Sequence, residues 1–497
     1  MMKARKIIIG ALAVAAAITA GLVACKKNVS DKSADHSLTA GINAVCGCSS
    51  VIKKDSILTG SITSNLHLRD SIRYRLSGLV FVTNGAVLTI DAGTKIVGIK
   101  AVGTTPGGGL VVTRGSRINA VGTASCPIVF TSEQAIPASG DWSGVILLGK
   151  AQTNAPNAFI EGINNTSYPG IDLQFGSADS IVGGVNVNND TSGILKFVRI
   201  EYAGFALSLN NEINGLTLGG VGRGTTIDFV EVFKANDDAF EWFGGTVNAS
   251  HLLAIDALDD MFDTDNGYRG SISFALGLSD TTRKDQSQSN GFESDNNATG
   301  TTATPITHPV YTNVTIIGVP TAGQASRTDS VAGLATRYGR AAHLRRNAEF
   351  SINNSIFFGF NYGLSMDSAL GNTVDKYYGR SPFGVASTLT HVYAAGYGTA
   401  ATPNDSSYAT ESNGVAATGA SFSNSSLFRN TAVAAGNVSG SRTPNPFSLS
   451  SPYTRPTTPS AANFIPGITS PARPYGAFPG GTDWTNVGGC SDWTRYK

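Results

Sequence analysis

A short acidic motif recurs along this chain and constrains its fold more than any other feature. Asp237-Asp238-Ala239-Phe240-Glu241 returns 22 positions later as Asp259-Asp260-Met261-Phe262-Asp263. A looser copy, Asn290-Gly291-Phe292-Glu293, places its phenylalanine 30 positions after Phe262. Self-similarity at roughly 20 to 30 residues is typical of a solenoid, in which each repeat forms one coil. The motif therefore predicts stacked coils that place carboxylates one above another.

Short β-like runs broken by Gly, Asn and Thr fill the chain from residue 56 to about residue 400. Thr83 and Thr113 close two such runs and lie 30 positions apart. The later runs 313–318 and 354–359 are 41 positions apart, which predicts an inserted loop over 320–340. No segment has the 3.6-residue apolar period of an amphipathic helix. Because one coil cannot bury its apolar face alone, we predict an all-β parallel β-helix over residues 56–400.

The last hundred residues differ in composition. Residues 401–497 are rich in Ser, Thr and Pro, with five prolines between Pro444 and Pro459. Proline cannot donate to a regular ladder, so this stretch is expected to form long loops or a strap along the solenoid. Trp484, Cys490 and Trp493 indicate that the end is fixed in place, and we expect it to cap an exposed coil edge.

The N-terminus predicts an address outside the cytoplasm. Lys3, Arg5 and Lys6 precede an apolar stretch over 7–23, and Leu22-Val23-Ala24-Cys25 then resembles a bacterial lipobox. We expect residues 1–24 to be a lipoprotein signal peptide, Cys25 to be lipidated, and the polar residues 25–55 to be a tether. The protein is then anchored by lipid to an outer membrane, facing the cell surface. An uncleaved anchor, or an ordinary signal with a chance cysteine, is the alternative.

Composition excludes some partners and leaves others open. The formal net charge of +1 becomes −2 without residues 1–24, which gives no basic footprint for nucleic acid. Only 14% of the residues are charged, while 58 are Gly, as suits a turn-rich β protein. Four cysteines remain besides Cys25, and in an oxidising compartment they are expected to form structural disulfides, with the pairing left open. They are Cys46, Cys48, Cys126 and Cys490. We expect a monomer.

Two further blocks carry a family resemblance. They are Gly140-Asp141-Trp142-Ser143-Gly144-Val145-Ile146-Leu147-Leu148-Gly149 and Asn211-Glu212-Ile213-Asn214-Gly215-Leu216-Thr217-Leu218-Gly219-Gly220-Val221-Gly222. With the acidic motif, they resemble right-handed parallel β-helix lipoproteins from the surface-protein repertoire of Bacteroidota-type bacteria. The resemblance covers roughly residues 56–370. It implies the fold and its handedness, and it brings no assigned activity.

The acidic motif is the candidate functional site, and three interpretations compete. The first is structural: Asp and Asn bind backbone N–H groups in turns between strands. The second is a Ca²⁺ site made from hard oxygen ligands, namely Asp263, Asp265, Asn266, Glu293 and Asp295. The third is catalysis by carboxylates of adjacent coils, with an arginine that abstracts a proton from an acidic sugar. Its candidates are Asp238, Glu241, Asp260, Asp263 and Arg345.

Aromatic side chains beside the motif suggest a ligand. Trp242 and Tyr268 flank the first two copies and are candidates to floor a shallow groove, because sugar rings stack on aromatic faces. A position of Trp242 beneath a loop is equally consistent with the sequence. The sequence favours a non-enzymatic binding or structural protein, with glycan as the expected ligand and Ca²⁺ as the expected ion. The alternative is a Ca²⁺-dependent polysaccharide lyase or a glycoside hydrolase that works on the acidic face.

Overall fold

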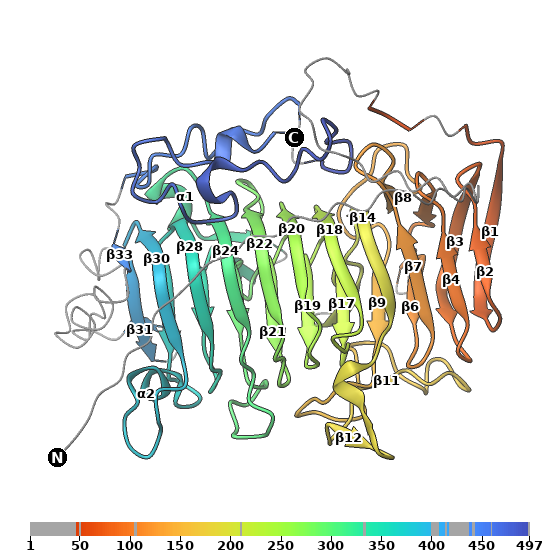
Figure 1. Ribbon diagram of the computed structural model, residues 1–497, viewed down its shortest axis with the longest axis horizontal. Helices are drawn as coiled ribbons and strands as arrows, with labels where there is room; N and C mark the ends of the chain where they lie inside the picture. Colours follow the sequence, from red (N-terminus) through yellow and green to blue (C-terminus); the bar gives the residue numbers. More distant parts are fainter. Residues whose placement is uncertain are drawn as a thin grey trace, which may run out of the picture. The chain divides into compact units, whose positions relative to one another are not determined.

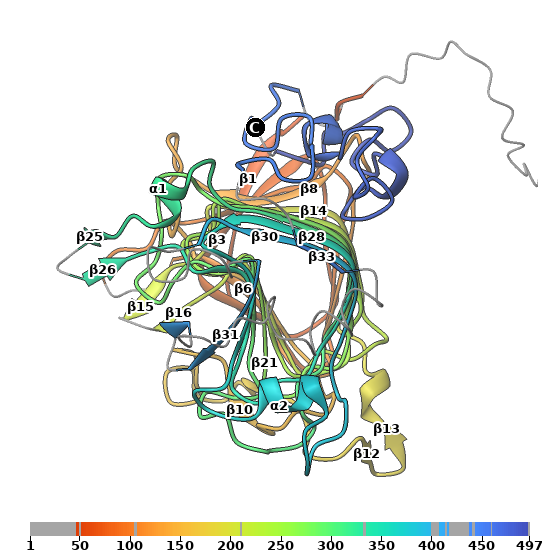
Figure 2. The same ribbon diagram turned by 90° about the vertical axis from the view of Figure 1, so that its left-hand side faces the viewer.

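The computed structural model describes residues 46–48, 51–103, 107–208, 211–331, 334–398, 407–412, 415–416, 437–439, 443–458 and 460–495. All of them belong to the unit Ala44–Lys497. Their strands wind into a right-handed parallel β-helix, which confirms the predicted fold class (Figure 1). Viewed along its length, the strands surround an interior filled by side chains (Figure 2). No helix in this part of the chain has the length and apolarity needed to cross a membrane.

One of three sheets along the β-helix carries the repeated motif and is called the acidic sheet. Its coils pair in parallel, with Phe240 beside Phe262 and Phe262 beside Phe292. The predicted offsets of 22 and 30 are therefore confirmed as coil lengths. The sheet contains the second half of β3 (Ile72–Val82), then β6 (Gly109–Val112), β9 (Gly144–Leu148), β17 (Leu216–Gly219), β19 (Phe240–Phe243), β21 (Phe262–Asp265), β23 (Phe292–Ser294), β27 (Arg340–Leu344), β29 (Tyr362–Asp367) and β31 (Tyr408–Ser412).

The other two sheets share long strands that bend once. The N-terminal halves of these strands belong to what we call the third sheet. Their C-terminal halves form what we call the strap sheet, because the C-terminal segment of the chain packs on it. The shared strands are β14 (Gly193–Glu201), β18 (Thr226–Phe233), β20 (Ala249–Ile255), β22 (Ser271–Leu278), β24 (Val310–Ile317), β28 (Ser351–Phe360) and β30 (Thr388–Gly396). Earlier coils supply β2 (Leu66–Leu68), β4 (Val87–Ile90) and β7 (Arg117–Val121) to the third sheet. They supply β1 (Lys54–Ile62), the first half of β3, β5 (Lys95–Gly98) and β8 (Ile128–Ser132) to the strap sheet, and β33 (Val438–Ser439) follows β30.

The bend between these sheets is a column of non-glycine residues with positive φ. Phe197, Phe229, His251 and Phe274 have φ between 51° and 54°. This backbone conformation costs an L-residue roughly 1–2 kcal/mol. Stacking of the side chains offsets part of that cost, with ring centroids 4.5 Å apart for Phe197 and Phe229 and 4.3 Å apart for Phe229 and His251.

Inside the β-helix, the motif phenylalanines form an aromatic column. Phe240 and Phe262 stack with centroids 5.5 Å apart, and Phe262 meets Phe292 edge-on at 5.7 Å. All three side chains are fully buried. Because phenylalanine points inward, strand alternation places the following acidic residue outside.

Insertions leave the coils at several turns. The segment between β9 and β14 holds β10 (Ala158–Phe159), β11 (Gln174–Phe175), β12 (Ile181–Val182), β13 (Val185–Asn186) and the 3₁₀ turn η1 (Val187–Asn189). Short hairpin strands β15 (Ala206–Ser208) and β16 (Asn211–Glu212) precede β17, and α2 (Thr373–Tyr378) follows β29. Between β24 and β27 lie α1 (Ala322–Ala325), β25 (Asp329–Val331) and β26 (Leu334–Thr336). The predicted loop over 320–340 and the 41-residue offset of Thr315 and Ile356 are thereby confirmed.

The C-terminal residues 443–458 and 460–495 form the strap, which includes η2 (Ala461–Phe464) and η3 (Pro479–Gly481). It lies along the side of the coils, drawn in blue in Figure 1. Its Phe447, Phe464 and Trp493 join one apolar cluster with outward residues of the strap sheet. The expectation that this end caps a coil edge is therefore wrong, because the apolar outer face of the sheet is what the strap buries. Most of residues 400–442 lie outside the described residues. Among those described is the short strand β32 (Val415–Ala416).

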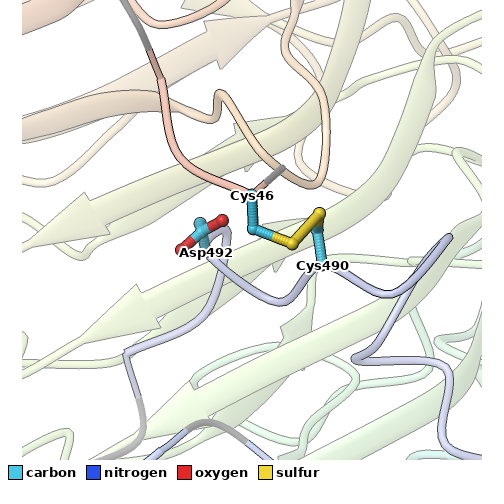
Figure 3. A group of neighbouring side chains, drawn as sticks. All are labelled: Cys46, Cys490 and Asp492. Atoms are coloured by element: carbon cyan, nitrogen blue, oxygen red, sulfur yellow. A yellow bond between two sulfur atoms is a disulfide. The ribbon is translucent and has the colours of Figure 1, made fainter. Parts of the chain in front are cut away.

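Two disulfides fix the chain ends to the first coils. Cys46 pairs with Cys490 of the strap (Figure 3), and Cys48 pairs with Cys126, which follows β7. The four cysteines are thus used as the structural links that the sequence predicts. The pairing itself follows from the path of the strap, which returns Cys490 to the N-terminal segment.

Candidate cation site on the acidic sheet

The motif residue two positions before each phenylalanine links adjacent coils. Asp238 Oδ1 accepts a hydrogen bond of 2.8 Å from the backbone N–H of Asp260, and Asp260 Oδ1 accepts one of 2.7 Å from that of Asn290. Asn290 Oδ1 then accepts one of 2.8 Å from the backbone N–H of Arg340. All three side chains are buried. The side chains at this position therefore bind backbone N–H groups of the next coil, rather than those of a turn between strands as the structural interpretation expected.

The residue after each phenylalanine forms a second, outward column. Glu241, Asp263 and Glu293 occupy matching positions on β19, β21 and β23, and His343 follows on β27. Each carboxylate is only partly exposed. Asp265 and Asp295 follow two positions further along their coils. This column is the face that sequence alternation predicted to meet water.

The later part of the column, Glu293 with Asp295 beside it, is called the upper half. Arginines from the next coil neutralise it. Arg345 forms ion pairs with Glu293 and, at 2.9 Å, with Asp295, while Arg346 contacts Asp295 at 2.7 Å. Burial opposes ionisation of Glu293, but Arg345 and the neighbouring His343 outweigh it and lower its pKa to about 2. The glutamate is therefore a stable anion within a compensated cluster.

The earlier part of the column, Glu241 and Asp263, is called the lower half. No arginine or lysine among the described residues forms an ion pair with it. Oxygens of Asp238, Glu241 and Asp263 lie within 4.8 Å of one another, and so do oxygens of Asp237, Asp238 and Asp259. None of Asp238, Glu241 and Asp263 forms an ion pair with another described residue. Burial, and then repulsion between the carboxylates, raises the pKa values of these three well above their ordinary range. We call Asp237, Asp238, Glu241, Asp259 and Asp263 the acidic cluster.

The acidic cluster also leaves hydrogen-bonding capacity unused. One carboxylate oxygen of Asp259 and one of Asp263 are buried without a hydrogen-bond partner. Asn214 donates its side-chain amide to Glu241, and Ser287 Oγ lies 2.5 Å from Asp259 Oδ2. An orphaned buried carboxylate oxygen is costly unless a cation or a proton satisfies it. Several hard oxygens converging in one place are the donor set that Ca²⁺ prefers, so these residues fit that ion.

The predicted calcium ligands are divided by the structure. Asp263 belongs to the acidic cluster, but Glu293 and Asp295 are taken by arginine. Asp265 Oδ1 accepts from the backbone N–H of Asn266 at 2.6 Å, and burial with repulsion from Asp295 raises the pKa of Asp265 to about 8. Of the predicted ligands, Asp263 is thus the one that belongs to the acidic cluster.

Sequence reasoning left Asp237 and Asp259 out of the ligand set, although they open the two copies of the motif. A signal was present in the charge pattern. No Lys or Arg occurs between Lys234 and Arg269, so the segment that holds the first two copies of the motif supplies neither. The third copy is followed on the next coil by Arg345 and Arg346, which marks it as the compensated one.

The aromatic candidates lie in the interior. Trp242 and Tyr268 are fully buried, with ring centroids 5.7 Å apart, and Tyr268 donates its hydroxyl to the carbonyl of Val247 at 2.8 Å. Strand alternation explains this, because Trp242 is two positions after the inward-facing Phe240. The prediction that they floor a groove for sugar is wrong, and the alternative of a buried Trp242 holds.

Arg345 is likewise unsuited to the proton abstraction considered for it. Burial lowers the affinity of its guanidinium for a proton, but Glu293 and Asp295 outweigh this and raise its pKa above the ordinary value. It therefore stays protonated and paired. Arg340 and Arg346 of the same coil are also engaged, by Gln288 and Asp295 respectively. The acid–base chemistry that remains is between carboxylates, with Asp260 committed to the backbone of the next coil.

Comparison with known proteins identifies the architecture. Residues 60–432, about three quarters of the chain, match the family described as a pectate-lyase like beta helix domain. The match spans all three sheets and the acidic cluster. No curated protein and no solved structure shows significant similarity to the chain.

Proposed function

We propose, from the premise that this chain belongs to the family of pectate-lyase like β-helix domains, that it is a non-enzymatic polysaccharide-binding protein whose acidic cluster holds Ca²⁺. The observation that carries the proposal is the uncompensated charge of Asp238, Glu241 and Asp263 together with the orphaned oxygens of Asp259 and Asp263. A divalent cation removes both the repulsion and the unsatisfied oxygens. No cation among the described residues does so.

The same cation would connect the protein to a ligand. Ca²⁺ takes roughly 6–8 oxygen ligands, and water or an incoming group completes a set that protein side chains leave open. Carboxylates on an acidic polysaccharide supply such oxygens. Because Glu241 and Asp263 are partly exposed on the outer face of the acidic sheet, an ion held there is within reach of a polymer lying along the coils.

Titration calorimetry with CaCl₂ tests the cation site. We expect the wild type to bind one Ca²⁺ and the double variant Glu241→Gln, Asp263→Asn to lose this binding. Glu133→Gln is the matched control, because Glu133 is paired with Arg75 on another sheet. Wild-type protein without measurable Ca²⁺ affinity contradicts the proposal.

Retention on immobilised polygalacturonate tests the ligand. We expect retention in the presence of Ca²⁺, release by EGTA, and little retention on a neutral glucan. The double variant should pass through both columns. Equal retention with and without EGTA would separate polysaccharide binding from the acidic cluster and refute the bridging role.

A glycoside hydrolase is the second candidate, and the raised pKa of Glu241 favours it. A carboxylic acid with a raised pKa is better suited to protonate a leaving group, and Asp263 lies beside Glu241 on the next coil. Reducing-end and unsaturated-product assays on a panel of acidic polysaccharides distinguish the two functions. Turnover by the wild type that Glu241→Gln abolishes would replace the binding function by an enzymatic one.

The proposed location is the outer membrane, with a lipid on Cys25 and a polar tether before the first coil. Cys25 and the rest of residues 1–45 lie outside the described residues. The two disulfides support a compartment outside the cytoplasm. Metabolic labelling with a fatty acid should mark the wild type and spare Cys25→Ala, and protease treatment of intact cells should digest a surface-exposed protein. Light scattering of the tether-free protein should give a monomer.

A further inference from the structure

The outer face of the strap sheet is apolar in the later coils and carries charged residues in the earlier coils. In its later coils the outward residues are apolar, such as Leu253, Leu276 and Ile356, and they belong to the cluster that includes the strap. In its earlier coils the corresponding positions are occupied by Lys95 on β5, Val129 on β8 and Arg199 on β14. The described strap ends at Arg495, beside the first charged coils. An uncovered charged surface therefore follows the covered apolar one.

A cleft of about 730 Å³ opens on this uncovered surface. It is lined by β5, β8 and β14, by Cys48 and Ile52 of the N-terminal segment, and by Arg495 of the strap. Small-molecule sites in proteins have volumes of roughly 300–1,000 Å³. The cleft is thus large enough for a ligand of one or two sugar rings or a comparable organic ion.

Three acidic residues line this cleft, Asp70, Glu133 and Glu201, and the last two are paired with arginines. Glu201 has only 2% of its side chain exposed, and it accepts hydrogen bonds of 2.9 Å each from Thr131 Oγ1, Arg199 Nε and an Arg495 guanidinium nitrogen. Glu133 accepts one of 2.7 Å from Arg75. These carboxylates offer little to an incoming ligand.

The basic residues in the cleft are the exposed ones. Lys95 is exposed and has no ion-pair partner among the described residues, and Arg495 exposes 42% of its side chain. Arg73 exposes the same fraction and is paired with Asp55 at the surface. Lys95 and Arg495 are therefore the exposed cationic groups that a ligand meets, whereas Glu133 and Glu201 are already paired.

We propose that this cleft is a binding site for a small organic anion, with Lys95 and Arg495 as its anchors. The ligand would carry carboxylate, sulfate or phosphate groups, which accept charge-assisted hydrogen bonds from ammonium and guanidinium groups. The cleft is separate from the acidic sheet, so this inference does not rest on the proposed Ca²⁺ site.

Binding at this cleft also acts on the strap. The disulfide between Cys46 and Cys490 holds the end of the strap against the N-terminal segment, with Asp492 beside it (Figure 3). A ligand that contacts Lys95 on the β-helix and Arg495 on the strap connects the two elements. It therefore stabilises the docked strap by the free energy of its binding.

Titration calorimetry with digalacturonate, inorganic sulfate and inorganic phosphate tests the site, in buffer with EGTA. We expect at least one of the three to bind the wild type, and the strongest one names the anionic group. Lys95→Ala should weaken that binding by about 10-fold or more, since a charge-assisted hydrogen bond is lost. Lys150→Ala, which removes an exposed lysine outside the cleft, should leave it unchanged.

Three further variants keep the result specific. Arg495→Met should weaken anion binding as Lys95→Ala does, and Lys95→Glu should abolish it without unfolding the protein, because Lys95 is exposed. Glu241→Gln, Asp263→Asn should bind the anion like the wild type, which separates this site from the acidic cluster. The proposal is overturned if none of the three anions binds at millimolar concentration, or if the Lys95 variants bind as tightly as the wild type.

Discussion

The two halves of the acidic column carry almost the same residues and have opposite electrostatic states. In the upper half, Arg345 and Arg346 pair with Glu293 and Asp295, and the pKa of Glu293 falls to about 2. In the lower half, Glu241 and Asp263 face each other without a cation, and their pKa values rise. Both halves use the same strand register and the same inward phenylalanine. The difference shows that the neighbouring coil, not the motif, decides whether a carboxylate is paired with a cation.

Removing the cation of the upper half should have the largest effect. Arg345→Met leaves Glu293 and Asp295 without their partner in a mostly buried position, and we expect a loss of about 3–5 kcal/mol in the free energy of unfolding. Urea unfolding measures it. Arg380→Met is the control, because the Arg380–Asp375 pair is exposed and should cost less than about 1 kcal/mol. Equal losses in the two variants would contradict the account of the upper half.

The same Glu→Gln substitution should change the free energy of unfolding in opposite directions in the two halves. Glu293→Gln removes a paired charge and should destabilise the protein by about 2 kcal/mol, whereas Glu241→Gln removes repulsion and should stabilise the calcium-free protein by about 1 kcal/mol. Thermal and urea unfolding in EGTA at neutral pH give both values. A destabilising Glu241→Gln in calcium-free buffer would mean that Glu241 has a partner that satisfies it.

The two halves should also contribute to stability with opposite dependence on pH. Raised carboxylate pKa values in the folded state stabilise it at low pH, and that contribution is lost as pH rises through them, toward about 8 for Asp265. The lowered pKa of Glu293 acts the other way, with stability present above about pH 4 and lost as pH falls toward 2.

Calcium-free wild type should therefore lose stability between pH 5 and pH 8, and Glu241→Gln should lose less. Saturating Ca²⁺ should remove this loss and, at about 100 times its Kd, add about 2.7 kcal/mol. Unfolding free energies over a pH series, with EGTA or CaCl₂, provide the measurement. Stability that is flat from pH 5 to pH 8 without calcium would argue that the lower-half carboxylates titrate normally.

The smallest expected effect concerns the links between coils. Asn290→Ala removes the acceptor for the backbone N–H of Arg340 and should cost about 1–2 kcal/mol. Asp238→Asn keeps an acceptor for Asp260 and removes a charge from the acidic cluster, so it should be neutral or slightly stabilising without calcium. Urea midpoints resolve the two. A strongly destabilising Asp238→Asn would show that its charge is required for folding.

Much of the fold could be read from local pattern. The spacing of Phe240, Phe262 and Phe292 gave the coil lengths, because an inward residue must repeat once per coil. The same alternation placed Glu241 and Asp263 outside, and it would also have placed Trp242 inside had it been applied two positions further. The predicted ligands Glu293 and Asp295 are instead paired with arginine, because the density of acidic residues was weighed without the cations of the next coil.

The sequence by itself determined the all-β solenoid, its coil lengths, the position of the insertion after residue 318 and the use of cysteines as links, since each follows from periodicity or residue chemistry along the chain. The tertiary structure alone decided which carboxylates are compensated, where the strap lies and that Cys46 pairs with Cys490. These outcomes depend on which distant segments come together. Coulombic interaction and burial act through space, so residues 50 to 444 positions apart can set the state of one another's side chains.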